Sequence, residues 1–308
     1  MMNNDTSEGL ERAFGDSVFL LRAAFGALRV RLLLSWTVGL GLVTYLCRVV
    51  GDPALAWLPA LLAWIAGLFG AACVSVSAAR HVRVNEKLPL KRSLGVAGRA
   101  TVCAFTAQVA WAAAAGTLFL LALSGQYLNF IPQLGDLLFS VWNYSLGLVA
   151  VFVVSAMVVA AVGFYPLVVP FAVVERPDPI AALTASLDYV RRRPLKYFFG
   201  CFTVLVGTLL ALVPFALVSV LAAALVLGSR LLQAGEVTPT HGIVPAVLAV
   251  LERLSPADGS VPETQVLGLW IAAFAAVSLQ LGCTRIFLIL RRDVDGVPMS
   301  KTAPDDVA

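Results

Sequence analysis

The fold class is decided by one charge-free stretch, YFFGCFTVLVGTLLALVPFALVSVLAAALVLGS, which occupies residues 197–229. About 20 apolar residues are enough for a helix to cross the hydrocarbon core of a bilayer. Five further charge-free stretches lie at 32–47, 53–79, 100–135, 137–174 and 264–284. Only 13% of the chain is charged, against about 25% in an ordinary soluble domain. The sequence therefore predicts an all-α, polytopic membrane helical bundle.

Six transmembrane helices are predicted, at 32–50, 54–79, 100–123, 138–163, 197–222 and 265–290. The first is slightly short and reaches spanning length if Arg48 snorkels to the interface. The stretch 137–174 is long enough for a hairpin of two helices or for one helix with an extension. Because proline removes a backbone donor and clashes with the preceding turn, we expect a break near Gly163, Pro166 and Pro170.

The distribution of basic residues sets the orientation. With six spans and the N-terminus inside, the cytoplasmic segments contain 19 of the 22 Lys and Arg residues, and the outer loops contain only Arg48, Arg230 and Arg253. Cytoplasmic loops of membrane proteins carry such an excess. A hairpin at 137–174 would move the basic residues around Arg191 to the outside, so a single span is favoured. Both termini are expected in the cytoplasm, with the chain in the inner membrane.

This topology divides the chain into a cytoplasmic segment 1–31 with an interfacial helix over 18–30, a transmembrane domain 32–292 and a cytoplasmic tail 293–308. The largest outer loop is expected at about 231–263, with one more helix over 243–254. No cleaved signal peptide is expected, because acidic and basic residues are both spread over the first 31 positions and no short cationic region leads to an apolar one.

The linker between the fourth and fifth spans contains clear helix signals. Asp178 is a favourable N-cap, and Pro179 suits the first helical position. The helix should end at Arg193, because Pro194 follows it. The apolar residues recur at spacings of three and four: Ile180, Leu183, Leu187 and Val190. We expect a short amphipathic helix that lies on the inner membrane surface or packs under the bundle.

Four basic residues crowd the end of this linker: Arg191, Arg192, Arg193 and Lys196. Beside an apolar stripe they are candidates for contact with anionic membrane lipids. The alternative is that they only enforce the topology, and both interpretations remain open.

No catalytic, cofactor-binding or metal-binding residues are predicted, and no cofactor is expected. His81 and His241 are far apart and lack ligands at metal-site spacing. The five cysteines fall inside apolar stretches and are expected to be small core residues. The segment from Asp293 to Gly296 lacks the ligand positions of a calcium loop and is expected to be a turn salt-bridged to Arg291 and Arg292.

Two amides inside the predicted spans, Gln108 and Gln280, are expected at comparable depth. Amides in hydrocarbon tend to form hydrogen bonds across helices, so they are candidates for a mutual interhelical bond.

Three stretches together resemble an uncharacterised family of bacterial six-span integral membrane proteins. They are Tyr165-Pro166-Leu167 leading to Glu175, the run Ser186 to Tyr197, and the run Leu290 to Gly296. More loosely, the layout is similar to the membrane-anchor domain of some glycerophosphodiester phosphodiesterases. The catalytic barrel of those enzymes is absent here, so the resemblance implies a membrane fold and no enzymatic activity.

The leading hypothesis is a non-enzymatic accessory, scaffold or envelope-organising subunit that acts through lipids, a membrane-protein partner or a second copy of itself. No nucleic-acid partner is expected. The alternative is a transporter or permease for a neutral or lipid-like small solute, with a cavity lined by Gln108, Gln280 and their neighbours. An ion-coupled transporter is disfavoured, because no ionisable residue lies near the predicted bilayer midplane.

Overall fold

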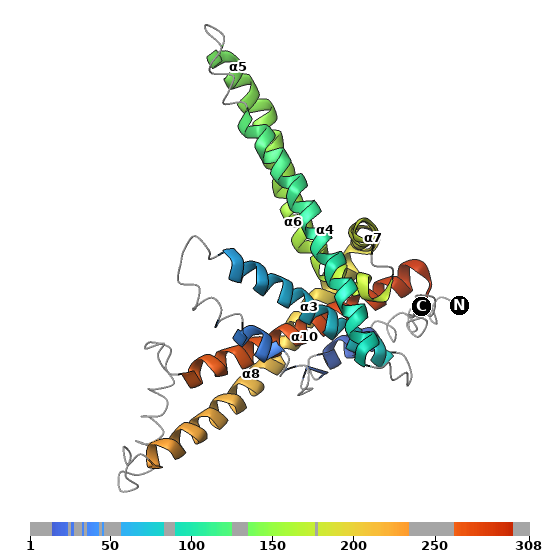
Figure 1. Ribbon diagram of the computed structural model, residues 1–308. Helices are drawn as coiled ribbons and strands as arrows, with labels where there is room; N and C mark the ends of the chain where they lie inside the picture. The colour runs from blue at the N-terminus through green and yellow to red at the C-terminus, as the bar shows by residue number, and fades with distance from the viewer. Residues whose placement is uncertain are drawn as a thin grey trace, which may run out of the picture. The chain divides into compact units, whose positions relative to one another are not determined.

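The computed structural model of the chain describes residues 14–23, 26–27, 33, 36–42, 45, 57–82, 90–124, 135–175, 178–233 and 262–297. Almost all of these residues are helical and none of them lies in a strand (Figure 1), which confirms the all-α prediction for this part of the chain. Three helices are long and apolar enough to cross a membrane: Trp57–Ala79, Pro194–Ala222 and Val266–Asp295. They coincide with three of the predicted spans.

The helices follow one another as α3 (Trp57–Val82), α4 (Leu90–Ser124), α5 (Gly135–Trp142), the π-helical segment η3 (Asn143–Gly147), α6 (Leu148–Val174), α7 (Pro179–Arg192), α8 (Pro194–Gln233) and α10 (Pro262–Asp295). The elements α5, η3 and α6 are continuous, so the stretch 137–174 is one helix and the hairpin alternative is excluded. The first predicted span and the predicted helix over 243–254 fall mostly or wholly outside the described residues. The six-span count and the orientation of the termini stay predictions.

The break predicted near Gly163 and Pro166 is wrong, because α6 continues through Pro166 and Pro170 to Val174. Each proline removes one backbone donor, and packed neighbours can stabilise the freed groups in apolar helices. Here residues 167–174 are all buried. The helix ends instead at Glu175, whose backbone is extended (φ −100°, ψ −151°).

Several helices are longer than their predicted spans. The predicted span 100–123 is part of a longer helix, α4, which begins at Leu90 and has 35 residues. Helix α8 continues to Gln233, into the predicted outer loop 231–263, and α10 continues to Asp295, past the predicted start of the tail at residue 293. The thickness of the bilayer sets the length of the apolar segment, but it does not set the length of the helix. The backbone hydrogen bonds of a helix can continue beyond the bilayer into the aqueous phase.

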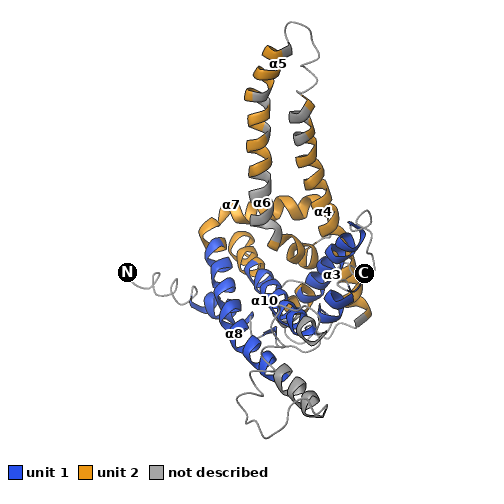
Figure 2. Cartoon of the chain, turned by 90° about the vertical axis from the view of Figure 1, so that its left-hand side faces the viewer, with its two compact units in different colours: residues 1–74, 198–286 blue, residues 75–197, 287–308 orange. Residues whose placement is uncertain are grey.

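The described chain divides into two compact units (Figure 2): residues 1–74 with 198–286, and residues 75–197 with 287–308. In the first unit, α8 and α10 approach closely at Gly282, where an added Cβ would lie 2.2 Å from Cγ1 of Val204. One turn away, the buried hydroxyls of Thr208 and Ser278 form a hydrogen bond of 2.9 Å. Small and hydroxylated residues at such crossings are typical of helices that associate in lipid.

The first unit also contains the helical segment 14–23, which covers the start of the interfacial helix predicted over 18–30. This segment packs against α8, since a Cβ added at Gly207 would meet Cδ2 of Leu21 at 2.9 Å. The guanidinium group of Arg285 lies 4.6 Å from the ring centre of Phe19 and donates to its carbonyl oxygen. The charge of Arg285 is therefore stabilised within the unit.

The second unit is built on α4 and α6, which pack against each other, and on α7, which contacts both (Figure 2). Helix α4 has a fully buried stripe of alanines at helical spacing: Ala97, Ala100, Ala104 and Ala107. The ring of Phe287, near the end of α10, packs edge-on against Phe171 and Tyr189 at centroid distances of 6.0 and 5.8 Å. The prediction of core cysteines is confirmed for Cys103, which is buried here, whereas Cys73, Cys201 and Cys283 are only partly buried.

Candidate functional site

Helix α7 begins and ends where local sequence signals place it. The side chain of Asp178 accepts a hydrogen bond of 3.0 Å from the backbone N–H of Ile180, and Pro179 occupies the first helical position. Arg193 ends the helix with non-helical backbone angles, and Pro194 opens α8 directly after it. The predicted N-cap and both predicted boundaries are confirmed.

The face that α7 buries differs from the predicted apolar stripe. The buried residues are Ala182, Ser186 and Tyr189, whereas Ile180 and Leu187 are 73% and 45% exposed. Ala182 and Ser186 are small enough to let α7 approach α4 and α6 closely. The buried ring of Tyr189 packs against Phe287. Helix α7 therefore packs against α4 and α6 through the face that contains Ala182, Ser186 and Tyr189, and its placement at the membrane surface stays a prediction.

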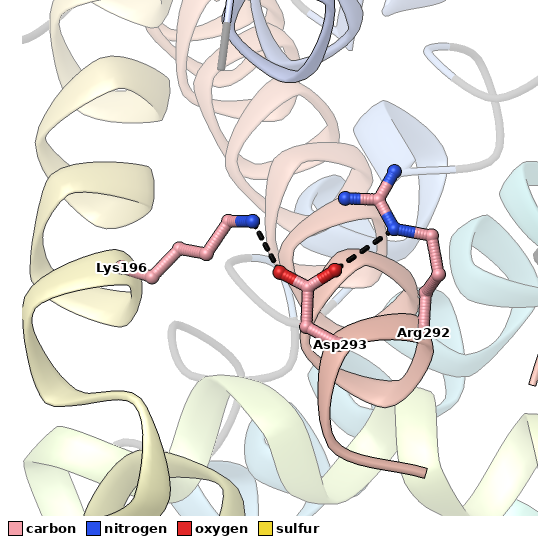
Figure 3. Close-up of polar contacts among 3 residues, drawn as sticks. All are labelled: Lys196, Arg292 and Asp293. Carbon is pink, nitrogen blue, oxygen red and sulfur yellow. Dashed lines mark hydrogen bonds and ion pairs between the residues drawn. The ribbon is translucent and has the colours of Figure 1, made fainter. Parts of the chain in front are cut away.

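An ion-pair cluster surrounds the C-terminal end of α10 in the second unit. Nε of Arg291 lies 2.5 Å from Oε1 of Glu175 at the end of α6. Asp293 accepts a hydrogen bond of 2.9 Å from Nε of Arg292 and pairs with Lys196 at the start of α8 (Figure 3). These contacts tie the last turn of α10 to the ends of two other helices.

The cluster corrects one sequence prediction. The pairing of Asp293 with Arg292 is confirmed, but Arg291 pairs with Glu175 instead. The segment is the last turn of α10 and not a separate turn: Gly296, with φ 67°, caps the helix by donating its N–H to the carbonyl oxygen of Arg292 at 3.1 Å. This left-handed cap needs glycine.

Tyr189 joins α7 to the same cluster. Its hydroxyl donates to the carboxylate of Asp295, a residue 106 positions away in the sequence. Burial raises the pKa of the Tyr189 phenol, and the hydrogen bond to Asp295 raises this pKa further. The phenol therefore stays protonated at neutral pH and acts as a structural donor.

The three stretches on which a family resemblance is predicted thus meet in space. Glu175 comes from the first stretch, Tyr189 and Lys196 from the second, and Arg291 and Asp293 from the third. No local pattern in the sequence predicts contacts among these residues, although all of them lie at helix ends beside apolar stretches. The cluster offers charge neutralisation between helix ends, which stabilises the fold.

Within the part of the chain that the structure describes, two of the four candidate lipid-contact residues form ion pairs with aspartates, and the other two do not. Arg192 forms an ion pair of 2.8 Å with Asp188, and Lys196 pairs with Asp293. Arg191 and Arg193 are exposed and have no ion-pair partner among the described residues. The lipid contact itself stays a prediction.

The candidate interhelical amides lie in different units, Gln108 on α4 and Gln280 on α10. Both amide atoms of Gln108 are buried and lack a hydrogen-bond partner among the described residues. Their mutual bond stays a prediction. The described part of the chain contains no group of three or more His, Cys, Asp or Glu side chains that could hold a metal ion.

A scan against protein-family models, a search of curated proteins and a search of solved structures each gave no match to this chain.

Proposed function

We propose that the chain is a non-catalytic, six-span inner-membrane protein that acts as an accessory, scaffold or envelope-organising subunit through partner proteins or lipids. The observation that carries this proposal is the use of charge in the second unit. Arg291 pairs with Glu175, Lys196 pairs with Asp293, and Tyr189 donates a hydrogen bond to Asp295. Each of these pairs joins the ends of two helices. Charged and polar groups that are paired in this way stabilise the packing of the helices.

The outward faces of the same unit support a role in association. On α4, Val102 and Val109 are 65% and 44% exposed, and on α6 Val151 and Phe152 are 63% and 73% exposed. Apolar residues on these faces are suited to contact lipid tails or the helices of another membrane protein.

Site-specific photo-crosslinking in native membranes tests this proposal. A photoreactive amino acid placed at Val102 or Phe152 should capture a defined protein partner, identified by mass spectrometry as another protein or a second copy of the chain. The same group at Ala104, which is fully buried, is the matched control and should capture none. Crosslinks to lipid alone from every exposed position would contradict action through a partner protein.

A transporter of a neutral or lipid-like solute is the second proposal, and one observation favours it. The buried amide of Gln108 has no hydrogen-bond partner among the described residues, and a buried amide that is left unpaired costs free energy. A solute with a hydroxyl or amide group would pair with it. Solute uptake into proteoliposomes that is lost in Gln108→Leu would support transport, and no uptake of any neutral solute by the parent protein would contradict it.

A further inference from the structure

The outer stripe of α7 consists of Ile180, Thr184, Leu187 and Arg191. At about 100° per residue, these four positions lie within about 60° of one another around the helix axis. The stripe is opposite the buried face formed by Ala182, Ser186 and Tyr189. Its two aliphatic residues are exposed although α7 has an extensive contact with α4 and α6.

Charge is distributed unevenly along this helix. Asp178 and its carboxylate lie at the N-terminal end, where the side chain caps the helix. The basic residues lie at the C-terminal end, and among them Arg191 and Arg193 are the exposed arginines without an ion-pair partner in the described ranges. Asp188, the acidic residue nearest to them on α7, is paired with Arg192. The C-terminal half of the outer stripe therefore presents a net positive charge beside exposed aliphatic side chains.

The connections of α7 place this charge at the level of the membrane surface. Helix α7 has 14 residues, and α6 ends at Val174, shortly before its first turn. At its other end, the candidate span Pro194–Ala222 begins one residue after Arg193. If both neighbouring helices cross the bilayer, as proposed above, α7 is held in the headgroup region. An interfacial helix there can direct its aliphatic residues into the acyl boundary.

We propose that the outer stripe of α7, together with Arg193, is a contact site for anionic phospholipids. The guanidinium groups of Arg191 and Arg193 each bind a lipid phosphate, and Ile180 and Leu187 contact the upper part of the acyl chains. Arginine suits this role because its planar donors pair with two phosphate oxygens at once. This inference rests on the proposed membrane function and names the class of lipid that the protein recognises.

Native mass spectrometry of the full-length protein in detergent, titrated with phosphatidylglycerol and separately with neutral phosphatidylcholine, tests the proposal. The test variant is Arg191→Gln with Arg193→Gln. The matched control is Arg192→Gln, on the same turn, whose arginine is already paired with Asp188. A further variant, Arg191→Lys with Arg193→Lys, keeps the charge and reports whether α7 tolerates substitution at both positions.

The parent protein should bind phosphatidylglycerol more tightly than phosphatidylcholine. Loss of one arginine should weaken this binding roughly fivefold, and loss of both roughly 25-fold, the size expected for a basic residue near an anionic leaflet. Arg192→Gln should change the affinity for phosphatidylglycerol by less than about twofold, and the double lysine variant should change this affinity by less than about fivefold. Equal binding by the double glutamine variant and the parent would overturn the inference, as would an equal loss in Arg192→Gln.

Extraction of native membranes with alkaline carbonate separates this inference from the function on which it rests. Release of the parent protein into the soluble fraction would overturn the membrane assignment itself. Retention in the membrane, combined with unchanged lipid binding by the double glutamine variant, would overturn the lipid site alone.

Discussion

The crossing of α8 and α10 at Gly282 gives a prediction whose magnitude follows from the structure. In Gly282→Ala, the new methyl group would lie 2.2 Å from Cγ1 and 3.0 Å from Cβ of Val204. Carbon atoms in contact are about 3.5 to 4.0 Å apart, so the two helices must separate by about 1 Å. Val204 cannot rotate away easily, because β-branched side chains are stiff in helices.

Overpacking of this kind costs about 1 to 3 kcal/mol. Separation of the helices would also weaken the hydrogen bond between Thr208 and Ser278, worth about 0.6 kcal/mol in membrane proteins. The higher helix propensity of alanine relative to glycine offsets up to about 1 kcal/mol of this loss of stability. We therefore expect Gly282→Ala to lower the free energy of unfolding by about 0.5 to 2.5 kcal/mol.

The measurement is unfolding in mixed detergent micelles by titration with sodium dodecyl sulfate, followed by tryptophan fluorescence. Gly268→Ala, also on α10, is the matched control, because nothing lies within 4 Å of the added methyl group. It should leave stability unchanged or raise it. Val204→Ala should recover part of the loss when combined with Gly282→Ala. If Gly282→Ala were as stable as Gly268→Ala, the close approach of the two helices would be refuted.

Three further predictions concern other parts of the chain. Tyr189→Phe should lower the free energy of unfolding at neutral pH. Because the folded-state pKa of the phenol is raised, its stabilisation is complete below about pH 10, the pKa of a free phenol, and declines progressively as the pH rises from there through the raised pKa. The deficit of the variant should therefore begin to narrow in unfolding titrations above about pH 10. A deficit that is constant from pH 7 to 11 would contradict the buried, protonated phenol. Gln108→Leu should leave the free energy of unfolding unchanged or raise it, because its amide has no hydrogen-bond partner among the described residues. A loss of about 0.6 kcal/mol that disappears in a Gln280→Leu background would instead demonstrate their mutual bond. A reporter enzyme that is active only outside the inner membrane should be inactive when fused near Thr184 and active near Gly242, and activity at Thr184 would overturn the six-span topology.

Local signals in the sequence were sufficient for some features. Charge-free length predicted the helical class and the three candidate spans, since a lipid environment leaves an apolar segment few alternatives to a helix. The bounds of α7 followed from Asp178-Pro179 and Arg193-Pro194, because capping and the steric effect of proline involve neighbouring residues only.

Tertiary structure alone decided which face of α7 is buried and which charges pair. The 3.6-residue period locates an apolar stripe, but it does not say which face of the helix its neighbours will cover. In α7 they cover Ala182, Ser186 and Tyr189 and leave Leu187 exposed. The partners of Arg291 and Asp295 come from helices about 100 residues earlier in the chain, and no local pattern encodes such a distance. The break predicted at the prolines of α6 is wrong for the same reason. The free-energy cost of a proline inside a helix is local, whereas the packing around residues 167–174 that offsets this cost exists only in the assembled unit.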